Sequence, residues 1–236
     1  MEIHYYETLP STNRTAAEAA RCGAAEFYTV VAGTQTAGRG RLDRSFFSPV
    51  GGTYFSTVLR PKFGFDLFSQ ITPMAAVAVH RAIFNVTGVV TEIKWINDLL
   101  LDGRKICGIL AESGVDENGI PYVILGIGIN TATVDFPPEL RESAGCVVCN
   151  DPARLVGAVL AELMQYEQIV AEQSWHDDYR RHCVCLGRIV EVIKHGNIRP
   201  AYAHDVVADG GLRVEYENGE TEILRGGEIS LRLTQF

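Results

Sequence analysis

Hydrophobic positions in the first half of the chain recur at two different spacings. Short runs rich in aromatic and β-branched residues predict strands, and longer Ala- and Val-rich stretches with a three-to-four-residue period predict helices. The predicted strands are residues 3–8, 27–34, 52–59, 89–95, 105–114 and 122–129. The predicted helices are residues 14–22 and 65–86, with a kink or break expected near Pro73.

The second half of the chain divides into a helical part and a strand-rich part. Asp151 and Pro152 suit the cap and first position of a long helix, whose apolar pattern continues to Tyr179. Gly-containing turns then separate short strands that predict a small SH3-like barrel. These strands are residues 188–193, 201–207, 212–216, 222–224 and 229–233. We therefore expect a larger domain over residues 1–185 and a small barrel over residues 186–236.

The charge balance argues against several classes of protein. The 236 residues include 21 Lys and Arg against 29 Asp and Glu, which gives a formal net charge of −8. Because nucleic-acid binding needs a surplus of positive charge on some face, we expect no nucleic-acid partner. The longest apolar stretch, residues 74–90, is interrupted by His80, Arg81 and Asn85, so we also expect no membrane-spanning segment.

The start of the sequence and its cysteines predict a cytoplasmic protein. The first residues are acidic and lack the apolar core of an export signal. The six cysteines are therefore expected to be thiols. Neither Cys146 and Cys149 nor Cys183 and Cys185 have the spacing and turn residues of zinc knuckles, so these thiols are expected to be buried or half-buried.

An arginine-rich loop after the second predicted strand is the first candidate for chemistry. Gly38 and Gly40 let backbone N–H groups approach an anion, and Arg39, Arg41 and Arg44 supply charge-assisted bonds to phosphate or carboxylate. The loop is not a Walker motif, because no Gly-Lys-Ser/Thr follows it, and its glycine spacing is not that of a dinucleotide site. The pattern predicts an anion-binding loop.

Two later segments extend the candidate site. Asn97 and Asp98 lie at a strand end, where they suit either a divalent cation that bridges phosphates or an ordinary turn. Lys105 leads into an apolar strand and would present a positive charge where negative charge develops. The strand at residues 125–130 carries glycines, which either leave room for a flat ligand or allow close backbone packing.

Four other aromatic and histidine residues are given structural interpretations. His176 and His182 lie on the long polar helix and are expected to face solvent. Tyr5 and Tyr6 lie in the first strand and are expected in the core.

In this order, the segments resemble the biotin–protein ligase family. The matching motifs are Ser11-Thr12-Asn13, Gly38 to Arg44, Lys94 to Asp98 with Lys105 and Gly108, Gly126 to Asn130, and Gly227 to Arg232. The resemblance implies an α+β fold, with helices that flank a central mixed β-sheet of the class II synthetase-like kind and a C-terminal SH3-like barrel. Because the sequence starts at the catalytic domain, it resembles the monofunctional group without an N-terminal DNA-binding domain.

The resemblance implies a two-step reaction. Biotin and ATP, with Mg²⁺, would give biotinyl-5′-AMP and pyrophosphate, and a lysine of a biotin carboxyl carrier domain of a carboxylase would then take the biotinyl group. Arg41 and Lys105 are the implied catalytic residues. The implied biotin-binding residues are Ser11, Thr12, Asn13, Gln35, Arg39, Gly40, Arg41, Lys105, Gly108, Gly126 and Gly128. The implied ATP-binding residues are Arg44, Phe46, Lys94, Asn97, Asp98 and Asn130.

These implied roles divide the site into a ring pocket and a charged pocket. The polar residues among the biotin contacts would hydrogen-bond the ureido ring, and Gly126 and Gly128 would give the ring room. Arg39 and Arg41 would hold the biotin carboxylate and the α-phosphate, and Asp98 would bind Mg²⁺. The resemblance also admits a homodimer through the side of the central sheet, which the residues leave open.

The sequence departs from the family pattern at three positions. Asp43 replaces a glycine of the arginine loop, Phe46 stands where a tryptophan usually stacks on adenine, and Ile96 replaces a proline. Two alternatives therefore stay open beside the biotin ligase: a lipoate or octanoate ligase or transferase on a related fold, and a protein that binds the ligand without turnover. A transcriptional regulator is disfavoured, because the chain shows neither a DNA-binding segment nor a basic surplus.

Overall fold

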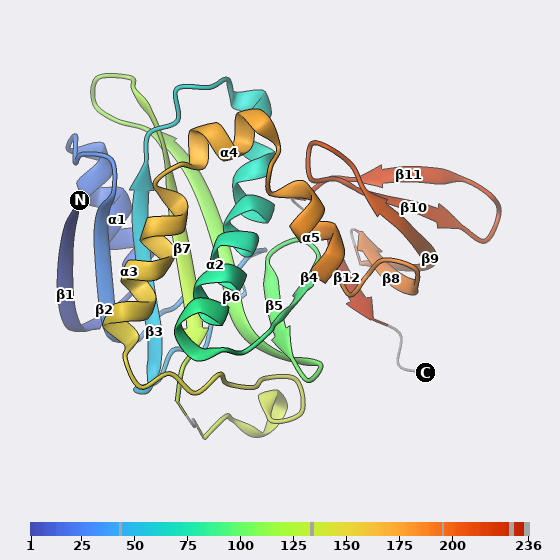
Figure 1. The fold of residues 1–236 in the computed structure, drawn as a ribbon, viewed down its shortest axis with the longest axis horizontal. Helices are drawn as coiled ribbons and strands as arrows, with labels where there is room; N and C mark the ends of the chain where they lie inside the picture. The colour runs from blue at the N-terminus through green and yellow to red at the C-terminus, as the bar shows by residue number, and fades with distance from the viewer. Residues whose placement is uncertain (43, 133–134, 195, 227–228, 234–236) are drawn as a thin grey trace.

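A mixed central sheet organises the chain, as the family resemblance implies. The computed structural model describes residues 1–42, 44–132, 135–194, 196–226 and 229–233. Within them, seven strands lie in the order β1-β2-β3-β7-β6-β5-β4, with β1 and β2 parallel and the other neighbours antiparallel (Figure 1). The strands are β1 (Glu2–Leu9), β2 (Tyr28–Gln35), β3 (Gly52–Leu59), β4 (Glu92–Lys94), β5 (Asp98–Leu101), β6 (Arg104–Val115) and β7 (Pro121–Asn130).

Helices cover both faces of this sheet. On one face, α1 (Thr12–Arg21) buries Ala16 and Ala20 against Val30, Val58 and Ile124 of the strands. On the other face, a larger apolar core joins the sheet to the remaining helices. These are α2 (Ile71–Thr87), α3 (Pro152–Leu163), α4 (Tyr166–Glu172) and α5 (His176–His182), with short 3-10 helices at Phe65–Gln70 and Pro138–Leu140.

The helix around Pro73 differs from the prediction in where it breaks. The break falls between Phe65–Gln70 and α2, and Pro73 is the third residue of α2. A proline in the first turn removes no intrahelical hydrogen bond, because the first N–H groups of a helix have no partner there. The combined segment Phe65–Thr87 is long and apolar enough to cross a membrane, but 67% of its most apolar window is buried inside the fold. It is therefore accounted for as a core helix.

The single long helix predicted from Asp151 to Tyr179 is wrong. Asp151 caps α3 by accepting a hydrogen bond from the Arg154 amide at 2.9 Å, but the segment contains three helices. Gln173 ends α4 with a φ of 53°, which turns the chain before α5 begins. Each helix keeps its own buried face, so one apolar period continues across the two breaks.

The interpretations of the tyrosines and histidines are also corrected. Tyr5 is 61% exposed on β1, which is an edge strand of the central sheet in the described residues. Tyr6 is exposed as well. His176 Nε2 lies 2.7 Å from the Val206 carbonyl oxygen, and the His182 ring lies 4.0 Å from the ring of His80. Both histidines therefore contact protein at the junction of α5 with neighbouring elements.

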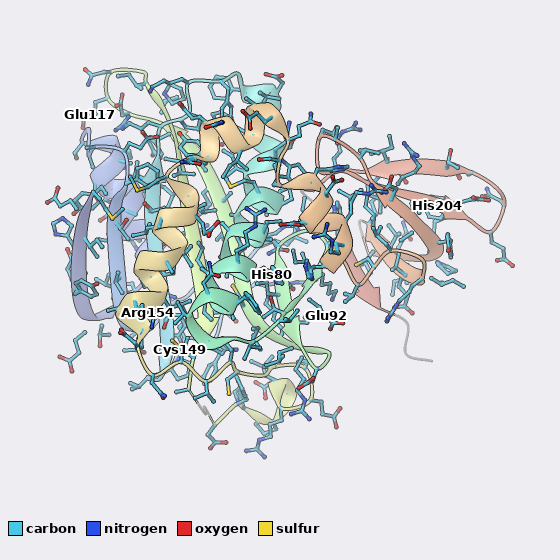
Figure 2. The ribbon with its side chains drawn as sticks, in the orientation of Figure 1. His80, Glu92, Glu117, Cys149, Arg154 and His204 are labelled. Carbon is cyan, nitrogen blue, oxygen red and sulfur yellow. The ribbon has the colours of Figure 1, made fainter. Side chains whose placement is uncertain are left out.

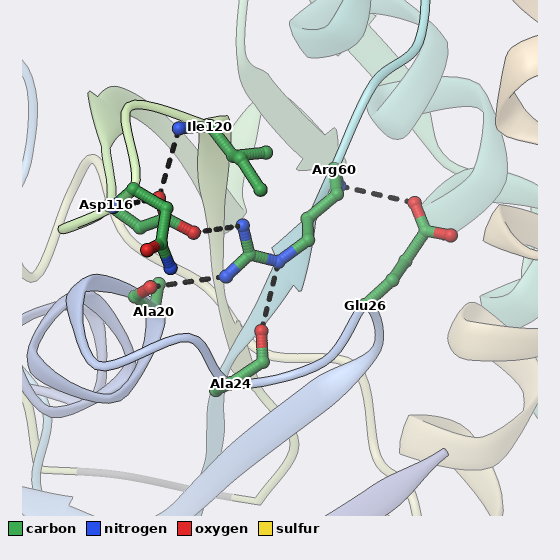
Figure 3. Close-up of polar contacts among 7 residues, drawn as sticks. Ala20, Ala24, Glu26, Arg60, Asp116 and Ile120 are labelled. Carbon is green, nitrogen blue, oxygen red and sulfur yellow. Dashed lines mark hydrogen bonds and ion pairs between the residues drawn. The ribbon is translucent and has the colours of Figure 1, made fainter.

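One half-buried arginine, Arg60, connects α1 to the end of β3 and to the β6–β7 hairpin (Figure 3). Arg60 Nη1 pairs with Asp116 Oδ2 at 2.9 Å, and its other guanidinium nitrogens donate to the Ala20 and Ala24 carbonyls. Asp116 also accepts from the backbone of the hairpin, and the Ile120 amide is the main cause of its lowered pKa. This network holds the far end of α1, whose first turn faces the site described below.

A second, antiparallel sheet follows α5. In the described residues its order is β11-β10-β9-β8-β12, and it lies to one side of the central sheet (Figure 1). The strands are β8 (Ile189–Lys194), β9 (Asn197–Val206), β10 (Leu212–Tyr216), β11 (Thr221–Leu224) and β12 (Ile229–Leu233). Trp95 Nε1 donates to the Gly210 carbonyl at 2.9 Å and so ties this sheet to the candidate site. Closure into a barrel stays a prediction, and Gly227 of the last motif lies outside the described residues.

Candidate functional site

A row of small residues hollows the face of the sheet that carries α1. On this face Ser56 of β3 pairs with Gly126 of β7, and Gly128 pairs with Gly108 of β6. A cavity with a volume of about 190 Å³ lies on this face. Of the predicted site residues, these line the cavity: Ser11, Thr12, Asn13, Gln35, Arg39, Gly40, Arg41, Arg44, Phe46, Lys94, Asn97, Asp98, Lys105, Gly108, Gly126 and Gly128.

The first turn of α1 and Gln35 of β2 form one end of the cavity, and Ser56 of β3 hydrogen-bonds to that turn from outside the lining. We call these four residues (Thr12, Asn13, Gln35 and Ser56) the amide end. The Thr12 amide donates to Gln35 Oε1 at 2.8 Å, and the Thr12 hydroxyl lies 3.1 Å from the same oxygen. Gln35 Nε2 in turn donates to the Ser48 hydroxyl at 2.9 Å. These neutral groups are held in place before any ligand arrives, which suits recognition of a ring with its own donors and acceptors.

Asn13 lies across β7 at the amide end. Its Nδ2 donates to Glu112 Oε2 at 2.7 Å, and its Oδ1 accepts from the buried Ser56 hydroxyl at 2.6 Å. A Cβ at Gly126 would overlap the Asn13 amide oxygen. In this structure the missing side chain at Gly126 therefore makes room for Asn13 rather than for a ligand.

At the opposite end of the cavity lie two positively charged side chains, Lys105 and Arg41. We call this the charged end (Arg41, Asn97, Asp98 and Lys105). Lys105 Nζ pairs with Asp98 Oδ1 at 2.7 Å, across the irregular register of β5 and β6. Arg41 Nη1 donates to Asn97 Oδ1 at 3.3 Å. Burial lowers the pKa of Arg41, and the Asp98 carboxylate opposes that shift, so the guanidinium stays charged near neutral pH.

The turn that carries Asn97 and Asp98 is held although Ile96 replaces the family proline. Asn97 Nδ2 donates to the Ile109 carbonyl at 2.8 Å, and the Ile109 amide donates back to the Asn97 carbonyl at 2.9 Å. The Tyr179 hydroxyl also donates to the Ile96 carbonyl at 3.2 Å. These contacts position the charged end without the proline ring.

Residues 5–130 contain both ends of the cavity and match the Biotin/lipoate A/B protein ligase family over more than half of the chain. The chain belongs to this family. The relatives include the bifunctional ligase/repressor BirA of Bacillus subtilis, which is 45% identical over 143 residues. They also include the biotin–[acetyl-CoA-carboxylase] ligase of Paracoccus denitrificans, which is 39% identical over 128 residues.

These relatives are matched over part of their length. The match to the Bacillus protein covers 59% of this chain and 44% of that protein, and the match to the Paracoccus protein covers 52% and 53%. The fold agrees over a longer span. The biotin protein ligase from Aquifex aeolicus, solved in complex with biotin and ATP, has a TM-score of 0.83 and 24% identity, and the match covers 99% of both chains.

In this member of the ligase family, Phe46 fills part of the hollow. Cβ atoms at Gly108 and Gly128 would meet its ring, and Lys105 Nζ lies 5.6 Å from the ring centroid. The space that these glycines leave is thus taken by an aromatic side chain in this structure. Asp43, the third departure from the family pattern, lies outside the described residues.

Two predicted residues have contacts that their sequence motif did not indicate. Asn130 is buried and donates to the Gly145 carbonyl at 2.8 Å, so it holds the end of β7 to a later segment rather than lining the cavity. Arg39 Nη2 pairs with Glu112 Oε1 at 3.1 Å. Arg39 therefore lies beside the amide end, whereas Arg41 belongs to the charged end.

Sequence reasoning missed Ser56 and Glu112. Both lie within predicted strands, where a single Ser or Glu reads as an ordinary polar position. The alternation of side chains along a strand could have indicated Glu112. It follows Gly108 by four residues and so lies on the same face of the sheet.

Proposed function

We propose that this chain is an ATP-dependent ligase that activates biotin as biotinyl-5′-AMP and transfers it to a lysine of a biotin carboxyl carrier domain. One observation carries the proposal: a neutral, pre-ordered polar end and a charged end face the same cavity. Family membership and the names of the relatives support it. The match to the Bacillus ligase/repressor covers 44% of that protein. For this chain we therefore propose the ligase activity alone.

The amide end would bind the ureido ring. Ser11, Thr12, Asn13 and Gln35 offer hydroxyl, amide and backbone groups, and the contacts of Thr12 with Gln35 and of Asn13 with Ser56 fix the orientation of three of them. A lipoyl or octanoyl chain has no comparable ring donors and acceptors, so these polar groups would lose hydrogen bonds to water without replacement. This difference favours biotin over the lipoate and octanoate alternatives.

The charged end would carry the chemistry of the first step. A biotin carboxylate oxygen attacks the α-phosphorus of ATP, the bond to the bridging oxygen breaks, and pyrophosphate leaves. Lys105 and Arg41 would stabilise the charge on the carboxyl and phosphoryl oxygens as the new bond forms. Arg39 would join them at the carboxylate if it leaves Glu112.

In the second step, the amine of the acceptor lysine attacks the mixed anhydride. An amide forms, AMP leaves, and the amine gives up a proton. No covalent enzyme intermediate is required, so the contribution of this chain is positioning and electrostatic stabilisation. Intact Lys105 and Arg41 argue against a protein that binds without turnover.

ATP would lie beside the charged end, with Arg44, Lys94 and Asn97 on its nucleotide side. Phe46 would serve as an aromatic platform once its ring leaves the space beside Gly108 and Gly128, and Asn130 would act indirectly by holding the end of β7. Mg²⁺ is usually held by one or two carboxylates together with substrate phosphates. A single carboxylate, Asp98, fits that donor set, and its Oδ1 is buried against Lys105. Bound Mg²⁺ would supply charge neutralisation of the phosphates.

The same proposal extends to domains, location and partners. We assign catalysis to residues 1–185 and a small SH3-like barrel to residues 186–236, supported by five antiparallel strands in the described part of the latter. The six cysteines, all in described segments, are thiols, which suits a cytoplasmic enzyme. A carrier domain is the proposed partner, while a homodimer and the absence of nucleic-acid and membrane partners stay predictions.

Biotin-dependent exchange of pyrophosphate into ATP tests the proposal. The purified chain should incorporate labelled pyrophosphate into ATP only when biotin is present. It should then transfer biotin to a carrier domain of acetyl-CoA carboxylase. Exchange that needs lipoate or octanoate instead of biotin would contradict the proposal in favour of the related ligases. Biotin binding without any exchange would favour the non-catalytic alternative.

A further inference from the structure

A chain of hydrogen bonds surrounds the amide end and returns to the loop from which it starts. From Arg39 it passes through Glu112, Asn13 and Ser56 to Thr12. It then continues from the Thr12 amide through Gln35 and Ser48 to the Phe46 carbonyl. Arg39 and Phe46 lie on the two arms of the same loop, so the network connects the loop to the first turn of α1.

In this hydrogen-bond network, Glu112 is the charged residue that lies outside the cavity lining. It lines a groove of about 400 Å³ on the outer side of Asn13 and Arg39, both of which line the groove and the cavity. Its two oxygens are divided, with Oε2 on Asn13 and Oε1 on Arg39. Glu112 therefore acts on the cavity through these two residues.

The Glu112 contact decides which way the Asn13 amide points. A carboxylate only accepts hydrogen bonds, so the NH₂ group of Asn13 must face Glu112 and its oxygen must face Ser56. The single Ser56 proton is then directed to Asn13 Oδ1, so the Thr12 hydroxyl, 2.7 Å from Ser56 Oγ, turns its own proton to Ser56 and leaves Gln35 Oε1 to the Thr12 amide. Without Glu112, both amide orientations would be open to Asn13.

We propose that Glu112 is a positioning residue for biotin recognition, because it sets the amide orientation of Asn13 and, through Ser56, the hydroxyl orientation of Thr12. This inference rests on the proposed function. The pair with Arg39 contributes less, because these side chains are 54% and 33% exposed and exposed ion pairs are weak. Asn13 is 5% exposed, so its hydrogen bond carries most of the effect.

Two substitutions separate these contacts. Glu112→Gln keeps an oxygen for Asn13 and loses the ion pair, so the KM for biotin in pyrophosphate exchange should rise less than about threefold. Glu112→Ala loses both contacts and should raise that KM about tenfold, with kcat within about twofold of wild type. Glu18→Gln is the matched control. Glu18 forms an exposed ion pair with Arg14 on α1, the helix that carries Asn13, and its substitution should change neither the KM for biotin nor kcat.

Exchange of the amide and the carboxylate between positions 13 and 112 distinguishes positioning of the ligand contacts from general support of the fold. Asn13→Asp alone places two carboxylates in contact and should raise the KM at least tenfold. Combined with Glu112→Gln, the new amide can donate to the new carboxylate, and the KM should return to within about fivefold of wild type. Thermal unfolding of each variant shows which ones are folded.

Two results would overturn the inference. One is a Glu112→Ala variant with unchanged KM, or with equal losses in KM and kcat. The other is a double variant that is no better than Asn13→Asp. Both presuppose biotin-dependent exchange by the wild-type chain, and absence of that exchange would instead refute the proposed function.

Discussion

The two ends of the cavity are built on different elements around the same sheet and prepare for their ligands differently. At the amide end, neutral groups bind one another in a continuous network from Asn13 to Ser48. At the charged end, Lys105 and Arg41 are occupied by Asp98 and Asn97. The amide end is thus pre-ordered for recognition, whereas the charged end must exchange partners when anions enter.

This difference predicts that substitutions at the two ends change different kinetic parameters. Contacts present equally in the ground state and the transition state alter KM, and contacts that strengthen in the transition state alter kcat. The amide end should therefore determine the KM for biotin. The charged end should determine the rate of adenylation.

The largest expected effect is at Lys105. Lys105→Ala should lower the rate of pyrophosphate exchange by about 100- to 1,000-fold, because it removes a positive charge placed where negative charge develops. The KM for biotin should change much less. Lys62→Ala, which removes an exposed lysine, is the matched control. Equal losses in rate and in biotin affinity would assign Lys105 to ligand holding.

A second effect concerns the support behind the charged end. His80 of α2 lies 2.8 Å from the hydroxyl of Thr91, next to β4, which leads into Trp95 and Asn97 (Figure 2). Burial, with help from the His182 ring, lowers the pKa of His80 from 6.5 to about 4, against the opposing Asp178 carboxylate. Between these values the unfolded chain binds the extra proton, so stability falls as the pH falls.

The expected size at pH 5 is about 2 kcal/mol relative to pH 7. His80→Gln does not titrate and can still hydrogen-bond Thr91, so it should lose less stability between pH 7 and pH 5 than wild type. Urea unfolding at both pH values measures this difference. Identical pH dependence in the two proteins would show that His80 is not the responsible group.

The smallest effect is expected at Gln35. Gln35→Leu removes the acceptor for the Thr12 amide and should raise the KM for biotin about tenfold, the equivalent of roughly 1.4 kcal/mol, with kcat nearly unchanged. Gln168→Leu, at an exposed glutamine that pairs with Glu172, is the control. A loss confined to kcat would break the proposed separation between the two ends.

The fold was more predictable than the contacts within the site. Turn residues and apolar periods marked most strands, because these signals are local. The strand β5 was missed, since Asp98–Leu101 is short and follows a motif that read as a turn. The breaks before and after α4 were missed because one apolar period continues across them.

The site showed the same division between local and non-local information. Motif residues predicted the lining of the cavity, but not what would fill the space beside each glycine. Asn13 lies at Gly126 and Phe46 at Gly128, and both contacts join segments far apart in sequence. Glu112 was missed for the same reason, since its partners Asn13 and Arg39 lie far from it in the chain.

The separation of recognition from charge stabilisation is tested most directly by calorimetric titration of biotin, without ATP, into three proteins. These are the wild-type chain, Lys105→Ala and Gln35→Leu. We predict that Gln35→Leu weakens biotin binding about tenfold and that Lys105→Ala weakens it less. A Lys105→Ala variant that binds biotin as weakly as Gln35→Leu, or more weakly, would contradict the account.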